Sequence, residues 1–130
     1  SHLMYFFDVS GSMSQEDVEC IVTELKHVKD TFTPEKITLA QFDTAIRDVL
    51  VIEEHDTFNG LKVIGRGGTD LSPVHAMIEA GKPTAAVIFT DMGCAPMNPL
   101  SSKTPVFWVV LNNPHAPIPF GEAVFIDTFQ

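Results

Sequence analysis

The first part of the chain changes from a continuous apolar run to a helical repeat. Residues 3–7 are apolar or aromatic without interruption, which is typical of a strand buried on both faces of a parallel sheet. Apolar residues then recur at three- and four-residue spacing over residues 18–32, which predicts an amphipathic helix. Ser14 and Asp17 have the spacing of a capping box at its start, and Pro34 marks its end.

A hairpin is predicted next. Residues 37–42 and 46–52 have the pattern of two strands, and only a tight link around Asp43 and Thr44 separates them. So short a link implies an antiparallel pair, because parallel strands need a much longer crossover connection. The residues that follow, 53–65, are mostly irregular.

A glycine-rich loop, residues 65–70, precedes a second predicted helix at roughly residues 72–80. Pro73 fits the first turn of this helix, and Gly81 fits its C-terminal cap. The loop lacks the Lys-Ser/Thr ending of a phosphate-binding P-loop, which argues against nucleotide binding.

Three further strands are predicted in the last part of the chain, at Ala85–Thr90, Val106–Leu111 and residues 123–129. Proline-rich stretches at residues 95–105 and 112–119 connect them. The order of strand, helix, hairpin, loop and helix, then three strands indicates an α/β fold with a mainly parallel sheet.

At 130 residues the chain is expected to form one domain. Residues 1 and 2 have the character of an affinity-tag remnant, so the domain is expected to span residues 3–130. Because the first strand begins directly after them, we expect this domain to come from the C-terminal part of a longer protein.

Charge and composition argue against several classes of protein. The net charge of −9 disfavours binding of nucleic acid by a basic face, and no apolar run approaches the about 20 residues of a membrane helix. Cys20 and Cys94 form no CxxC pair, which excludes a zinc ribbon or a thioredoxin motif. Two free thiols and no signal peptide indicate a reducing compartment, so a cytoplasmic location is expected.

Candidate ligand residues follow the predicted strands. Asp8, Ser10 and Ser12 come directly after the first strand, Thr69 lies in the glycine-rich loop, and Asp91 follows Ala85–Thr90. Ligands of parallel sheets bind beyond the carboxyl ends of the strands. All five donors are hard oxygens, which favour Mg²⁺, Mn²⁺ or Ca²⁺ over zinc or copper. So few carboxylates leave the charge of an ion poorly compensated, so an anionic ligand from outside is expected.

These motifs resemble the metal-ion-dependent adhesion site (MIDAS) of von Willebrand factor A (VWA) domains. The pattern DxSxS at residues 8–12, a threonine in a glycine-rich loop, and an aspartate after an apolar strand occur in the order found in that family. The resemblance implies a Rossmann-like, doubly wound, mainly parallel sheet of about six strands with one antiparallel edge strand. It also implies Mg²⁺, Mn²⁺ or Ca²⁺ as cofactor, with Ser10, Ser12 and Thr69 as ligands and Asp8 and Asp91 binding directly or through water.

The function implied by this resemblance is a non-enzymatic protein-binding module. In the family, a glutamate or aspartate of the partner often completes the metal shell. The segments Phe89-Thr90-Asp91, PVFWV at residues 105–109 and Pro119-Phe120-Gly121 resemble a bacterial VWA-like family that usually follows a metallopeptidase-like domain. That likeness implies a MoxR-type ATPase or another domain of the parent protein as partner. Because the chain is short, some peripheral helices are expected to be short or absent.

Two alternative functions remain open from the sequence. In a metal-dependent phosphatase of the haloacid-dehalogenase type, Asp8 would be the nucleophile and Asp91 would help to bind Mg²⁺. Such enzymes carry a second aspartate where this chain has Ser10, and no suitably placed phosphate-binding lysine is evident. The other alternative is a scaffold domain whose metal site is unoccupied.

Several candidate residues also have plain structural interpretations. Ser12 and Asp70 have the positions of helix caps, and Cys94 has no neighbouring base in sequence that would make it a nucleophile. His75 falls near the candidate site, but no histidine pair has metal-ligand spacing.

Overall fold

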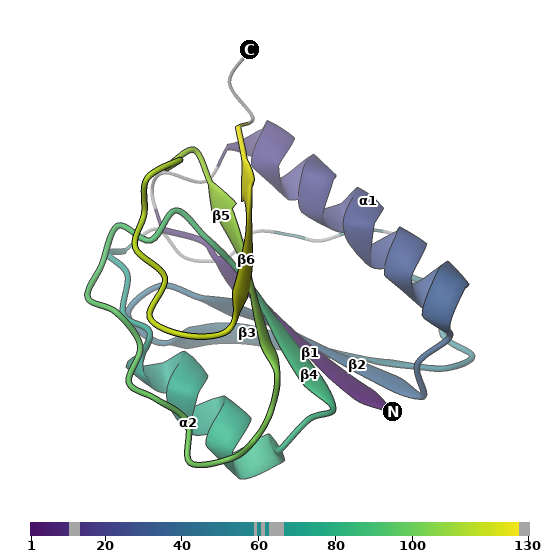
Figure 1. Cartoon of the computed structure of the whole chain (residues 1–130). Helices are drawn as coiled ribbons and strands as arrows, with labels where there is room; N and C mark the ends of the chain where they lie inside the picture. Colours follow the sequence, from purple (N-terminus) through teal and green to yellow (C-terminus); the bar gives the residue numbers. More distant parts are fainter. Residues whose placement is uncertain (11–13, 59, 61, 63–66, 128–130) are drawn as a thin grey trace.

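The computed structural model describes residues 1–10, 14–58, 60, 62 and 67–127. Its centre is a six-stranded sheet with the order β3-β2-β1-β4-β5-β6 (Figure 1). The pairing of β2 with β3 is antiparallel, and every other pairing is parallel. This confirms the predicted α/β fold with one antiparallel edge strand. The strands are β1 (His2–Asp8), β2 (Lys36–Phe42), β3 (Ile46–Glu53), β4 (Ala85–Thr90), β5 (Val106–Leu111) and β6 (Glu122–Ile126).

Helix α1 (Gln15–Phe32) begins and ends as the sequence predicts. The Ser14 side chain accepts a hydrogen bond from the Asp17 N–H at 3.1 Å, and the Asp17 side chain accepts one from the Ser14 N–H at 3.0 Å. The capping box is therefore formed. Thr33 adopts the left-handed conformation at the C-terminal end, directly before Pro34.

Helix α2 (Ser72–Gly81) has Pro73 in its first turn, as predicted, but Gly81 is not its C-terminal cap. The capping residue is Lys82, which has a φ of 44° and donates its N–H to the Ile78 carbonyl at 2.8 Å. A Cβ at position 81 would collide with Cε of Met4, the flexible end of that side chain, so Gly81 leaves room for the present position of Met4. The helix continues through Gly81.

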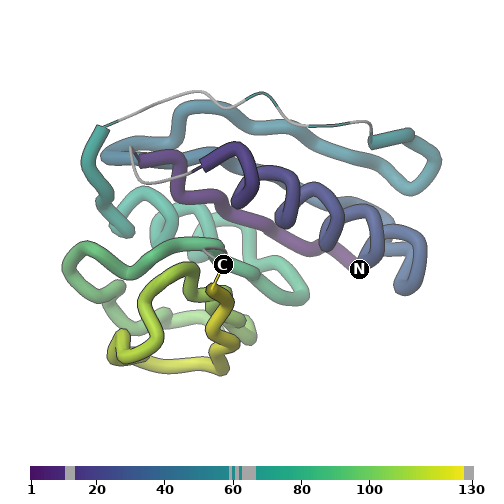
Figure 2. The backbone as a smooth tube through the Cα atoms, turned by 90° about the horizontal axis from the view of Figure 1, so that it is seen from above, coloured from purple at the N-terminus to yellow at the C-terminus, as the bar shows by residue number. Residues whose placement is uncertain are grey.

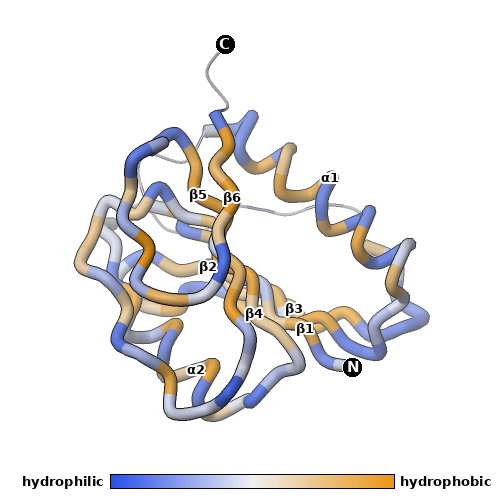
Figure 3. The backbone as a smooth tube through the Cα atoms, viewed as in Figure 1, coloured by the Kyte–Doolittle hydropathy of each residue, from blue (hydrophilic) through white to orange (hydrophobic). Residues whose placement is uncertain are grey.

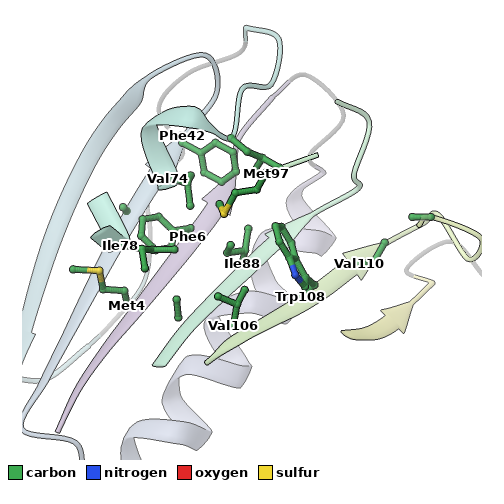
Figure 4. Close-up of a cluster of buried hydrophobic side chains, with 14 residues drawn as sticks. Met4, Phe6, Phe42, Val74, Ile78, Ile88, Met97, Val106, Trp108 and Val110 are labelled. Carbon is green, nitrogen blue, oxygen red and sulfur yellow. The ribbon is translucent and has the colours of Figure 1, made fainter. Parts of the chain in front are cut away.

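Each face of the sheet carries its own core. On the α2 side, the cluster in Figure 4 joins residues of that helix, such as Val74 and Ile78, to Phe6, Ile88 and Trp108 of the sheet. On the α1 side, a second cluster joins residues of α1 to side chains of β1, β2 and β4. Strands that are buried on both faces explain the continuous apolar runs in the sequence.

The connections after β4 and β5 contain no helix, which agrees with the expectation of missing peripheral helices. Residues 91–105 and 112–121 both pack into the core on the α2 side, through side chains such as Met97, Ala116 and Phe120. The indole N–H of Trp108 donates to the Phe120 carbonyl at 2.8 Å, which fixes the second connection. The final strand begins one residue earlier than predicted, at Glu122, and ends at Ile126; residues 128 and 129 of the predicted strand lie outside the described residues. Among the described residues, no helix is long and apolar enough to cross a membrane.

Candidate metal centre

Asp8 is at the centre of the candidate site. It is the last residue of β1, the strand that lies between β2 and β4 in the sheet. Only 2% of its surface is exposed. The Ser10 backbone N–H donates to its Oδ1 at 3.0 Å, and the Thr90 hydroxyl donates to its Oδ2 at 2.7 Å. These bonds hold the carboxylate at the carboxyl edge of the sheet, where ligands of doubly wound sheets bind.

Thr69 reaches Asp8 from a separate loop, 61 residues further along the chain. Its hydroxyl lies 3.3 Å from Oδ1 and 3.4 Å from Oδ2 of Asp8. A hydroxyl that donates its proton to a carboxylate keeps its lone pairs for a cation. Neighbouring oxygen ligands of an octahedral Mg²⁺ lie about 3 Å apart, since each is about 2.1 Å from the ion. The Thr69–Asp8 spacing therefore fits a hard divalent cation.

The other candidate ligands are placed as follows. Ser10 is buried beside Asp8, and its backbone N–H donates a hydrogen bond to the Asp8 carboxylate. Asp91 is half-buried directly after β4, at the same edge of the sheet, and its Oδ1 accepts the Gly93 N–H at 2.9 Å. Ser12 lies outside the described residues. The structure thus joins Asp8, Ser10 and Thr69 by hydrogen bonds and places Asp91 after the neighbouring strand.

The backbone around Asp91 has two distinctive features. Met92 has a φ of 60°, in the left-handed region that non-glycine residues seldom adopt. The side-chain amide of Asn113 donates to the Asp91 carbonyl at 2.8 Å, which ties the segment after β4 to the loop after β5.

The carboxylates produce a negative field at this edge. Burial raises the pKa of the Cys94 thiol to about 11, together with the charges of Asp8, Asp91 and Asp70. At neutral pH the thiol is therefore protonated, which argues against a role as nucleophile. A field that disfavours a thiolate favours a bound cation.

Thr90 is a site residue that the sequence analysis missed. It is fully buried, and its hydroxyl donates to Asp8 while it accepts the Met92 N–H at 3.2 Å. The register of β1 with β4 pairs Phe7 with Phe89, so the next residues, Asp8 and Thr90, are neighbours. In the sequence, Thr90 could have been found as a hydroxyl residue that ends an apolar strand directly before Asp91.

Asp43 is a second residue that the sequence analysis did not connect with the site. Its buried carboxylate accepts hydrogen bonds from Arg47 Nε at 2.6 Å, the Gly67 N–H at 3.1 Å and the Ala45 N–H at 3.2 Å. Its backbone carbonyl accepts the Asp70 N–H at 2.9 Å. Asp43 thus holds both ends of residues 67–70, the segment that carries Thr69.

The pKa of Asp43 reflects this network. Burial acts to raise the pKa, but the hydrogen bonds from Arg47 and from the backbone N–H groups of Gly67, Ala45 and Thr44 outweigh it and lower the pKa to about 2. The carboxylate is therefore charged at neutral pH and serves as the acceptor for the loop.

Asp70 and His75 have local structural partners. Asp70 Oδ1 accepts the Ser72 N–H at 2.9 Å at the start of α2, and the His75 ring lies 3.1 Å from the Pro99 carbonyl through Nε2. Within the described residues, no three His, Cys, Asp or Glu side chains are grouped so that they could hold a metal ion. An ion at this edge would therefore depend on hydroxyl oxygens as well as carboxylates.

The chain forms a doubly wound sheet with one antiparallel edge strand and polar side chains after β1 and β4, which is the architecture of a VWA-like α/β domain. Residues 3–127 match the family described as VWA-like domain (DUF2201), and the chain belongs to that family. The fold is similar to the crystal structure of the conserved hypothetical protein BatB from Bacteroides thetaiotaomicron. That similarity has a TM-score of 0.59 and 13% identity, and it covers 97% of this chain and 90% of BatB. No curated protein matches the chain significantly.

Proposed function

We propose that this VWA-like domain is a protein-binding module that depends on a divalent cation, Mg²⁺ or alternatively Mn²⁺ or Ca²⁺. The observation that carries the proposal is the contact between Thr69 and Asp8, which lie 61 residues apart in the sequence. The Thr69 hydroxyl donates to the Asp8 carboxylate, with oxygen–oxygen distances of 3.3 and 3.4 Å. Asp8, Ser10, Ser12, Thr69 and Asp91 supply the oxygens, all of them hard donors suited to these ions.

The proposed partner presents an acidic side chain to the ion. Where Asp8 and Asp91 bind through water, the ion contacts three neutral hydroxyls directly, and a carboxylate from outside would compensate its charge. A MoxR-type ATPase or another domain of the parent protein is the expected source of that carboxylate. Water would occupy the position in the free domain.

The surroundings of Asp8 favour binding over catalysis. Phosphatases of the haloacid-dehalogenase type carry a second aspartate as general acid two residues after the nucleophile. This chain has Ser10 there, buried beside Asp8, and a serine hydroxyl is too weak an acid for that role. We therefore propose a module without catalytic activity of its own, in preference to a phosphatase.

Binding of Mn²⁺, followed by electron paramagnetic resonance, tests the proposal directly, with Mg²⁺ and Ca²⁺ as competitors. The wild type is expected to bind one Mn²⁺ ion, and Thr69→Ala and Asp91→Ala are expected to bind it much more weakly. Asp30→Ala, which removes an exposed carboxylate on α1, is the matched control and should bind like the wild type. No wild-type binding, or equal binding by all four proteins, would contradict the metal site and favour the scaffold alternative.

Thermal unfolding gives an independent measure of the same site. An ion at about a hundred times its dissociation constant stabilises a domain by roughly 2.7 kcal/mol if it binds the folded state alone. The melting temperature of the wild type should therefore rise with the ion and fall back in EDTA. The Asp91→Ala variant should show no such dependence.

A further inference from the structure

Strands β4, β5 and β6 carry an apolar surface on the α1 side that no helix of the described residues covers. Figure 2 shows α1 lying along β1, with the β2–β3 hairpin on one side of it and β6 set apart on the other. A helix is about 10 Å wide and strands are about 4.8 Å apart, so one helix covers about two strands. Both connections between β4 and β6 pack on the opposite face. The outer strands on the α1 side are therefore left open.

The floor of this surface is continuous across three strands. Strand register places Phe89 of β4 beside Val109 of β5, and Val109 beside Val124 of β6. Val124 is 57% exposed and Phe107, on the same face, is 39% exposed. Figure 3 shows the corresponding hydrophobic stretches in β4, β5 and β6. An apolar patch of this kind on a folded domain marks an interaction site.

A groove of about 260 Å³ lies between this floor and α1. Glu24 and Val28 of α1 form one wall, and Val109, Val124 and Ile126 belong to the floor. The groove lies beside α1 on a face of the sheet. In an α/β domain, a second helix can pack at such a position. We name the floor and groove together the β6 groove.

The charged groups of the β6 groove are acidic. Glu24 is on the α1 wall, and Glu122 begins β6 on the same face as Val124. None of the described residues that line the groove is a lysine or arginine. Burial and the charge of Glu24 together raise the pKa of Tyr5 to about 12, which is consistent with a negative field in the groove.

We propose that the β6 groove binds an amphipathic helix of a partner protein, with its apolar stripe on Val109, Val124 and Ile126 and with flanking Lys or Arg side chains beside Glu24 and Glu122. The apolar floor matches the helix-in-groove mode of recognition, and the acidic borders require a basic partner. A second copy of this chain fits less well. In a symmetric dimer through this groove, the acidic borders of the two copies would face each other. The proposal concerns a different surface from the metal site and does not depend on it.

The probe is a synthetic helix of about 18 residues with leucines at helical spacing and lysines on both borders of the stripe. Two peptides serve as controls. One has the same composition with the leucines scattered around the helix, and the other has glutamates in place of the lysines. Binding is measured by calorimetry and by methyl NMR shifts, in EDTA and again in Mg²⁺. Equal affinity in both buffers is expected, so a failure of the metal proposal does not affect this result.

The expected result is saturable binding of the lysine peptide alone, with shifts at Val109, Val124 and Ile126. Val124→Lys should weaken binding by about tenfold or more. Val49→Lys is the matched control, because Val49 is an exposed valine on β3 at the other edge of the sheet. The double variant Glu24→Lys, Glu122→Lys should prefer the glutamate peptide.

Three outcomes would overturn the proposal. The first is equal binding of the scattered peptide, and the second is a set of shifts that maps to β3 or to the metal edge. The third is concentration-dependent dimerisation in sedimentation experiments that Val124→Lys abolishes, since it would assign the groove to a second copy of the chain. Thermal melts of each variant show that the exposed substitutions leave the domain folded.

Discussion

The carboxylate of Asp43 accepts the backbone N–H of Gly67 at 3.1 Å, and this bond links the end of β2 to the loop that carries Thr69. The same carboxylate binds Arg47, and the Asp43 carbonyl binds the Asp70 N–H. A Cβ at Gly67 would lie 3.2 Å from Asp43 Oδ2, so glycine permits this close approach. Asp43 is thus a positioning residue for a candidate ligand that it does not touch.

The substitution Asp43→Asn tests this positioning role. An asparagine amide keeps one acceptor oxygen, so it cannot accept from both Arg47 and Gly67, and its NH₂ group faces a donor. We expect a loss of about 1–3 kcal/mol in the free energy of unfolding and weaker Mn²⁺ binding. Urea unfolding and paramagnetic resonance measure the two effects. The control Asp48→Asn changes a half-buried carboxylate on β3 and should alter neither. Unchanged Mn²⁺ affinity in Asp43→Asn, with a loss in Thr69→Ala, would contradict the positioning role.

Asp43 also predicts a pH dependence of stability. Its pKa in the folded chain is about 2, below the ordinary value of 3.8. A carboxylate with a depressed pKa stabilises the fold fully above its unfolded-state pKa, and this contribution is lost as the pH falls through the folded-state pKa. The stability advantage of the wild type over Asp43→Asn should therefore shrink between about pH 4 and pH 2. Urea unfolding of both proteins across this range measures it. A constant difference would show that the charge of Asp43 does not carry the effect.

Thr90 is predicted to stabilise the fold through Asp8. Thr90→Val keeps the shape of the side chain but removes the donor to Asp8 and the acceptor for the Met92 N–H. Asp8 Oδ2 would keep only the longer bond from Thr69, and the Met92 N–H would lose its acceptor, so we expect a loss of about 1–3 kcal/mol in the free energy of unfolding. Thr90→Ser should retain most of the stability.

The control for this substitution is Thr23→Val. Its hydroxyl is exposed and donates to the Glu19 carbonyl one turn earlier in the same helix. Urea unfolding should show a change of a few tenths of a kcal/mol there. Equal changes in the free energy of unfolding for Thr23→Val and Thr90→Val would mean that the hydrogen bond from Thr90 to Asp8 stabilises the fold no more than an exposed one.

The sequence predicted the elements whose signals are local. The capping box of Ser14 and Asp17, the hairpin on either side of Asp43, and the apolar runs of β4 and β5 each depend on neighbouring residues. Motif order was enough to nominate Asp8, Thr69 and Asp91 as one group, because the carboxyl ends of parallel strands share an edge.

The features that the sequence did not predict depend on contacts between distant segments. Asp43 has the position of an ordinary turn residue until the fold brings Gly67 to it. Gly81 has the position of a cap until Met4 packs against it. Thr90 requires the register of β1 with β4 before it meets Asp8. A single sequence records none of these pairings, since each joins segments that are far apart along the chain.

Gly121 gives a prediction about the turn that enters β6. Its φ is +77°, and a Cβ there would lie 2.5 Å from the Val106 carbonyl oxygen, a backbone atom that cannot rotate away. Gly121→Ala should therefore lower the free energy of unfolding by about 1–3 kcal/mol, through strain and displacement of β6. The control Gly68→Ala should be tolerated, because the nearest atom among the described residues would be Thr44 Cγ2 at 3.8 Å. Urea unfolding of the two variants measures the difference. If both alanines have the same effect, the turn is not limited by this contact, and β6 can shift to accept the added methyl group.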